Sequence, residues 1–193
     1  MRARRTALIL FGIICFGAVL YLGWQRNGPN TFEAAFQPGG EVVLDLSVGS
    51  FTIRGAAENK IWVELEPNTS GAHSEISVKG TQAKVKIEGP SHDFKAVIYV
   101  PKQSNLVANQ TMGELRVEDV EGNKSLGLNI GQIKVVADPK QIKTLDASAK
   151  IGEVNAGAWR RSHGGFFPSF RMNGQGAYSL RAIVDIGQVD LRD

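Results

Sequence analysis

The sequence predicts an all-β domain, built as a β-solenoid-like stack of short strands and preceded by one transmembrane helix. Three observations support this prediction. A short phrase containing glycine recurs along the chain, alternating apolar and polar residues dominate after residue 31, and the first residues are apolar over a long stretch. A β-sandwich is the alternative, because its turns recur at a similar spacing.

The recurring phrase is an apolar residue, a glycine, a mostly polar residue and then an alternating run. Its glycines lie 64, 18, 21 and 35 residues apart. These intervals are close to multiples of a unit of roughly 18–21 residues, and a fixed period of this size is typical of repeat architectures. We expect two short strands per rung, with the glycines lining one corner of the stack, where a positive φ is needed. These structural glycines are Gly49, Gly113, Gly131, Gly152 and Gly187.

Strand signals follow one another through the body of the chain. Apolar and polar residues alternate, or nearly so, in several short segments, and one continuous apolar run ends at Pro101. Turn residues such as Gly71, Gly80 and Gly122 separate the segments. No stretch after residue 30 has a helical period. The alternating segments are 41–46, 60–65, 75–78 and 83–88, and the apolar run is 96–100.

The N-terminal segment has the features of a membrane anchor. Residues 6–24 carry no charge, and a helix of about 20 apolar residues spans the hydrocarbon core of a bilayer. Arginines precede this segment, so the positive-inside rule leaves the N-terminus in the cytoplasm. A cleaved signal peptide is the alternative, although no small-x-small cleavage site is present. The expected parts are a cytoplasmic N-terminus (1–5), a signal-anchor helix (6–24), a linker (25–31) and an exported β domain (32–193).

This topology gives a single crossing of the membrane, with the N-terminus in the cytoplasm and the C-terminal domain exported. The net charge of +3 does not indicate nucleic-acid binding. All the acidic residues follow Trp24, and the basic excess comes from Arg2, Arg4 and Arg5. Cys15 is the only cysteine and lies in the apolar segment. The exported domain therefore lacks both disulfides and zinc sites built on cysteine.

The order of these motifs resembles the bacterial putative-adhesin family, over about residues 31–193. The similarity lies in the apolar run ending at Val100-Pro101, the Met112-Gly113 and Ile130-Gly131 units, and the final pair of segments, 174–180 and 186–191. The resemblance implies a β-solenoid-like "toastrack" module, often carried behind a membrane helix in envelope proteins. With the anchor, it also implies a location in the bacterial inner membrane, with the C-terminal domain in the periplasm or outside the cell. It implies no catalytic residues.

One segment, 158–173, departs from the regular rungs, and we interpret it as a loop outside the stack. It combines arginines, which form planar hydrogen-bonding forks, with aromatic side chains that stack on sugars or guanidinium groups. The alternative is that its aromatic residues fold back and cap the open end of the stack. The candidate binding residues are Trp159, Arg160, Arg161, His163, Phe166, Phe167, Phe170 and Arg171.

Signals for enzyme chemistry are weak. Ser162 and His163 are adjacent, which does not by itself give a nucleophile and base the required geometry. The three histidines show no metal-ligand spacing. The acidic residues at 118, 119 and 121 are expected to be a solvated corner. The sequence therefore predicts no catalytic residue, no metal and no cofactor.

The expected function is that of a non-catalytic interaction module, with an envelope protein or a cell-wall glycan as its partner. Terminal strands also offer edges for self-association, and Gln188–Leu191 is the expected edge. Two alternatives stay open: an enzyme acting on envelope polysaccharide, and a regulatory or sensor subunit for envelope stress.

Overall fold

The computed structural model describes residues 25–26, 31–66, 71–89 and 94–193. Within these residues the chain is all β, with one 13-stranded mixed sheet and two short 3-10 helices. The strands are β1 (Gln25–Arg26), β2 (Thr31–Ala35), β3 (Glu41–Ala56), β4 (Lys60–Leu65), β5 (His73–Lys79), β6 (Gln82–Glu88), β7 (Lys95–Pro101), β8 (Asn105–Glu118), β9 (Lys124–Val136), β10 (Ile142–Ala156), β11 (Arg161–Phe166), β12 (Ser169–Asn173) and β13 (Tyr178–Arg192). The helices are η1 (Pro139–Gln141) and η2 (Gly157–Trp159).

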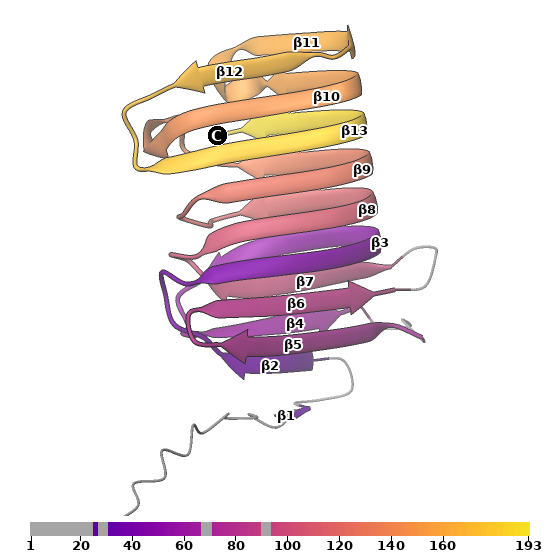
Figure 1. Ribbon diagram of the computed structural model, residues 1–193, viewed down its shortest axis with the longest axis vertical. Coiled ribbons are helices and arrows are strands. Elements are labelled where there is room, and N and C mark those ends of the chain that lie inside the picture. The colour runs from indigo at the N-terminus through magenta and orange to yellow at the C-terminus, as the bar shows by residue number, and fades with distance from the viewer. Residues whose placement is uncertain (1–24, 27–30, 67–70, 90–93) are drawn as a thin grey trace, which may run out of the picture.

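Five long strands form the centre of the molecule. They lie side by side in the order β3, β8, β9, β13, β10, all parallel, and each one bends back at the same side of the stack (Figure 1). Every second side chain points inward, so residues at paired positions form buried columns, such as Phe51, Leu115, Ile133, Val189 and Val154. Each bent strand therefore adds one layer to a continuous apolar core.

The glycines of the recurring phrase meet at the bend. Gly49, Gly113, Gly131, Gly187 and Gly152 occupy paired positions on the five neighbouring strands. All five have positive φ, between 122° and 154°. The strands also approach closely there, because a Cβ added to Gly131 would lie 1.9 Å from the carbonyl oxygen of Gly113. The bend thus requires glycine for both its backbone conformation and its close packing.

The two short strands expected in each unit are, in the central rungs, one continuous bent strand. The 64-residue interval between Gly49 and Gly113 is built differently from the central rungs. β6 pairs with residues 41–46 of β3 and β7 pairs with residues 50–56, so two separate strands make up this rung. β5 and β4 then add to β6 and β7 in the antiparallel direction. A rung made of two pieces does not need a continuous bend, which explains why the phrase is missing between Gly49 and Gly113.

The C-terminal strand is not an edge, so this prediction was wrong. β13 lies between β9 and β10, and Gln188–Leu191 pairs with residues 132–135 on one side and 153–156 on the other. After β10 the chain forms β11 and β12 on the outer side of β10 and then returns to the gap between β10 and β9. Strand order along the chain therefore differs from strand order in the sheet.

The expected anchor at residues 6–24 lies outside the described residues. None of the helices in the part of the chain that the model describes is long or apolar enough to cross a membrane. In the expected linker, β1 pairs antiparallel with β2.

Candidate functional site

Segment 157–173 forms the last rung of the sheet and is not a loop. β11 runs antiparallel to residues 151–156 of β10, and β12 runs antiparallel to residues 144–148 of the same strand. Gly165 lies opposite Gly152 and also has a positive φ, of 117°. The row of corner glycines therefore continues onto β11, although the chain direction is reversed. We call segment 157–173, which contains η2, β11 and β12, the terminal rung.

Along β11, polar residues occupy positions that are apolar core positions in the central rungs. In the register of β11, His163 lies opposite the buried Val154, and Arg161 lies opposite the buried Ala156. All six residues of β11 are exposed. Two columns that are apolar throughout the central rungs thus end in polar residues, as expected where a stack of repeats meets water.

η2 and β12 seal the core with apolar side chains. Trp159, Phe170 and Met172 are partly buried and pack against the core cluster. The rings of Trp159 and Phe170 lie 6.2 Å apart, centre to centre, at a tilt of 48°. These residues act as a cap, which is the alternative that the sequence left open for this segment.

Phe166 and Phe167 do not take part in this cap. Their side chains are 80% and 76% exposed. The backbone N–H of Phe167 donates to the carbonyl of Lys150 at 2.8 Å, and Phe167 has a φ of 56°. This turn from β11 to β12 holds both rings at the corner of the stack.

Phe166 also ends a row of exposed apolar residues that sequence reasoning did not identify. It lies opposite Ile151, which is followed on the next strands by Ile186, Ile130 and Met112. These are the apolar residues that precede glycine in the recurring phrase, and each is more than two-fifths exposed. The recurring phrase could have revealed this exposed row, because a residue beside a sharp outward bend cannot reach the core.

The arginines of the terminal rung differ in their surroundings. Arg171 Nε donates to Asp146 Oδ1 at 2.9 Å, and this contact raises the pKa of Arg171 above its ordinary value. Arg160 and Arg161 are exposed and form no ion pair with any described residue. Arg160 has a left-handed backbone (φ 55°) and follows η2. The structure thus brings together, at one end of the sheet, two unpaired cations and two exposed aromatic rings.

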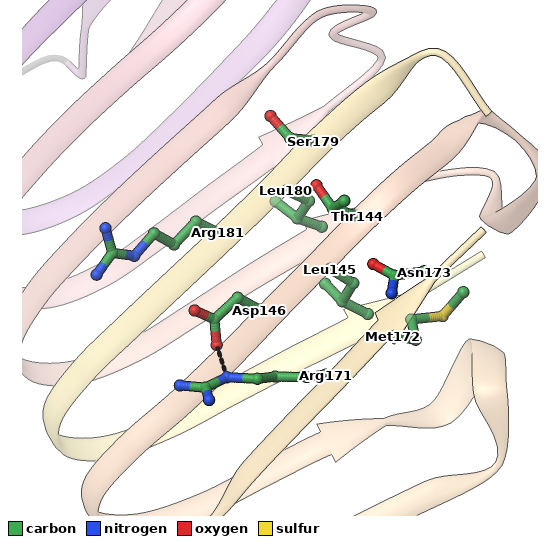
Figure 2. Close-up of a pocket in the computed structure, with 9 residues that line it drawn as sticks. All are labelled: Thr144, Leu145, Asp146, Arg171, Met172, Asn173, Ser179, Leu180 and Arg181. Carbon is green, nitrogen blue, oxygen red and sulfur yellow. Dashed lines mark hydrogen bonds and ion pairs between the residues drawn. The ribbon is translucent and has the colours of Figure 1, made fainter. Parts of the chain in front are cut away.

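Beside the terminal rung lies a shallow depression on the outer face of the sheet. Its volume is about 510 Å³, and it is lined by residues of β12, β10 and β13 (Figure 2). Asp146 lies between Arg171 and Arg181, which occupy paired positions on the neighbouring strands. Thr144, Leu145, Met172, Asn173, Ser179 and Leu180 complete the lining. The polar members offer hydrogen bonds to hydroxyl or carboxylate groups.

The serine and two of the carboxylates considered for enzyme chemistry each have a partner among the described residues. Neighbouring residues of a strand point to opposite faces, and Ser162 Oγ donates to Glu153 Oε1 at 2.8 Å instead of contacting His163. Glu118 is held by Arg54 and Arg116, and Glu121 pairs with Lys102 at 2.9 Å. Among the described residues, no group of three or more His, Cys, Asp or Glu could hold a metal ion.

The sequence matches no family model and no curated protein. Among solved structures, it is similar to a putative cell adhesion protein from Clostridium sporogenes. The TM-score is 0.51 at 16% identity, and the match covers 86% of this chain and 99% of that one. Putative adhesins from Parabacteroides distasonis (TM-score 0.26, 11% identity, 83% and 68% covered) and Parabacteroides merdae (0.24, 9%, 84% and 95%) match too weakly to carry an argument. The likeness to the clostridial protein is one of fold, over almost the full length of that chain.

Proposed function

We propose that this chain is a non-catalytic binding module of the bacterial envelope. The anchor expected at residues 6–24 holds it in the inner membrane, and the solenoid-like stack of bent strands serves as a rigid scaffold outside. One finding supports this proposal: the fold resembles that of a protein described as a putative cell adhesion protein. The partner we favour is another envelope protein.

The observation that carries the proposal is the terminal rung. It lies at the opposite end of the sheet from β1 and β2, which follow the expected anchor (Figure 1). It combines a strand edge with Phe166 and Phe167, whose exposure is the highest among the large apolar side chains described. Exposed aromatic side chains on a rigid support are typical contact residues in protein interfaces.

Replacing both rings, in Phe166→Ser/Phe167→Ser, is expected to abolish partner binding without unfolding the domain. Because both side chains are largely exposed, the melting temperature should stay close to that of the wild type. Crosslinking in the native membrane, followed by purification of the full chain, should recover an envelope protein with the wild type. Recovery should fall about tenfold or more with the variant, because aromatic contacts of this kind often contribute 2 kcal/mol.

The matched control is Met112→Ser/Ile130→Ser, which removes exposed apolar side chains from the same row but from inner rungs. This control should capture the partner as the wild type does. Equal recovery of the same protein with the wild type and the phenylalanine variant would contradict a contact through the terminal rung.

A cell-wall glycan is the second candidate partner, and the depression beside the terminal rung favours it. Arg181 has no ion pair there with a described residue, and it lies close in register to Asp146 and Arg171 (Figure 2). If a glycan binds at this place, Arg171→Ala/Arg181→Ala should weaken retention of the full chain on purified cell-wall polysaccharide. Retention that is unchanged in this variant would exclude the depression as the glycan site.

A further inference from the structure

We infer that the outer edge of β11 binds an extended segment of a partner protein as an added strand, and that this segment is acidic at one end and apolar at the other. The inference rests on the proposed binding function and names the chemistry of the partner. It draws on three features of the terminal rung: a free strand edge, an unbalanced positive charge, and exposed aromatic rings at the far end of the same strand.

The outer edge of β11 has no strand partner among the described residues. β11 is the last strand in the sheet order, and within the described part of the chain it pairs only with β10. In an antiparallel pair, every second residue directs its N–H and C=O away from its neighbour. The N–H of Phe167 points to Lys150, so this alternation places the outward groups at Phe166, Gly164 and Ser162. These unpaired donors and acceptors form a template for one further strand.

The side chains along this edge leave room for another backbone. Gly164 and Gly165 lie near the Phe166 end of β11, and neither has a Cβ to obstruct an approaching chain. A Cβ built on Gly165 would meet nothing within 4 Å, whereas one on Gly152, one rung inward, would lie 1.8 Å from the carbonyl oxygen of Gly187. In the central stack, the backbone of a neighbouring rung lies against each corner glycine. Beyond β11 the corresponding space is open.

The charge at one end of β11 selects an acidic partner. Segment 157–173 contains three arginines and one histidine but no aspartate or glutamate. Arg171 is neutralised by Asp146, whereas Arg160 and Arg161 have no ion pair with a described residue. Acidic side chains on the added strand would supply the missing counter-charge, and arginine can bind a carboxylate through two parallel hydrogen bonds.

The other end of β11 selects apolar side chains. Phe166 is the last residue of the strand, and Phe167 and Ile151 are exposed beside it. Five residue steps separate Arg161 from Phe166, which is about 17 Å in an extended strand. The charged and apolar contacts therefore lie at opposite ends of a segment of about six residues. In the antiparallel orientation, the apolar end of the partner segment comes first along its chain.

A second copy of the same chain fits this edge poorly. Pairing β11 antiparallel with its own copy would place the arginines of each chain opposite the apolar end of the other, so none of the four unpaired arginines would gain an acidic partner. The inward positions of β11 are Arg161 and His163 instead of apolar residues, so a second stack could not extend the core. We therefore assign the edge to a different, acidic protein segment.

The test is selection of peptides from a displayed library of random twelve-residue sequences against the detergent-solubilised full chain. We expect β-branched or aromatic residues at every second position near the N-terminal end of the enriched peptides. Aspartate or glutamate should occur near their C-terminal end. Arg160→Glu/Arg161→Glu should weaken the best peptide roughly tenfold or more, because like charges would then face each other. Lys79→Glu/Lys84→Glu, an equal charge change at the far end of the sheet, should leave its affinity unchanged.

Backbone hydrogen exchange separates strand addition from other modes of binding. The bound peptide should slow exchange at the amides of Ser162, Gly164 and Phe166. Basic or uncharged consensus peptides, or an affinity unchanged in the arginine variant, would overturn the acidic partner. Failure to enrich any peptide, or a bound peptide that leaves these amides unprotected, would overturn strand addition. Self-association of the chain that protects the same amides would overturn it in favour of a second copy.

These outcomes of the peptide test can be distinguished from an outcome that contradicts the proposed binding function. A partner recovered by crosslinking and lost in Phe166→Ser/Phe167→Ser would preserve the binding module even if the peptide selection fails. Recovery that is independent of the two rings, by contrast, would remove the basis of both.

Discussion

Replacing Gly131 with alanine is expected to lower the free energy of unfolding by about 3 kcal/mol or more. Gly131 has a φ of 136°, and its Cβ would lie 1.9 Å from the carbonyl oxygen of Gly113 on the adjacent strand. The backbone conformation alone costs an L-residue about 1–3 kcal/mol. The close contact adds to this cost because the obstacle is backbone in the centre of the sheet, which cannot move without disturbing both neighbours. Urea unfolding followed by circular dichroism measures the difference.

Two glycines of the terminal rung provide matched controls. Gly165 also has a positive φ, but its Cβ would meet no atom within 4 Å, so Gly165→Ala should show only the conformational cost. Gly164 has neither feature, since its nearest contacts would be at 3.6 and 4.0 Å, and Gly164→Ala should change stability by less than about 0.5 kcal/mol. If Gly131→Ala unfolds at the same urea concentration as Gly164→Ala, the tight corner is not required by the fold.

Replacing Lys124 with methionine is expected to stabilise the protein at pH 7 by about 2 kcal/mol. Lys124 is only 4% exposed, at the start of β9, where its ammonium donates to the carbonyl of Gly122 at 3.0 Å. Burial lowers the pKa of Lys124 from 10.5 to about 8, and the charge of Glu121 opposes this change. Such a change corresponds to about 3 kcal/mol. Methionine cannot donate the hydrogen bond to Gly122, and this loss lowers the stability of the variant by about 1 kcal/mol.

The same residue makes stability depend on pH. The folded protein releases this proton near pH 8 and the unfolded chain near pH 10.5. Between these values the unfolded state binds more protons, so the stability of the wild type should rise with pH. Below pH 8 the full penalty for the buried charge should be present. Lys124→Met should abolish this rise.

The exposed Lys143, at the start of β10, provides the control for this prediction. Lys143→Met should retain the rise in stability between pH 8 and 10.5. A Lys124→Met variant that is less stable than the wild type at pH 7 would show that the ammonium is stabilised in its buried site.

Much of the central stack could be predicted from the sequence, because each bent strand repeats the same local requirement. The glycines of the phrase occupy the bend, and the alternating residues after them form the buried columns. The glycine at position 165 was not recognised as part of this row. It lies in a strand of reversed direction, so the order of residues in the phrase is reversed as well: Gly165 precedes Phe166, whereas Ile151 precedes Gly152.

The order of strands could not be read from the repeat. Any bent strand with a glycine at its corner can pair with any other, so Gly187 fits beside Gly131 or beside Gly152 equally well. The structure shows it between them. This insertion depends on the path of the chain through β11 and β12, which the local pattern does not specify. For the same reason, the sequence predicted the free edge at Gln188–Leu191, whereas the structure has it at the terminal rung.

The eight candidate binding residues share one region of the fold, but the sequence did not predict what each of them contacts. The eight residues lie in or beside one rung, but they have different roles. Trp159 and Phe170 pack against the core, and Arg171 pairs with Asp146. A count of arginines and aromatic residues cannot separate these roles, because they depend on which side of β12 each residue occupies and on the strand that β12 covers.

The measurement that tests the central claim most directly is residue-resolved hydrogen exchange of the full chain without a partner. The account predicts that the amides of Gln188–Leu191 exchange only through global unfolding, because both neighbours of β13 are strands. The outward amides of Ser162, Gly164 and Phe166 should exchange almost as fast as in an unfolded peptide. Fast exchange at Gln188–Leu191 together with protection along β11 would contradict the account, since the C-terminal strand would then be the free edge.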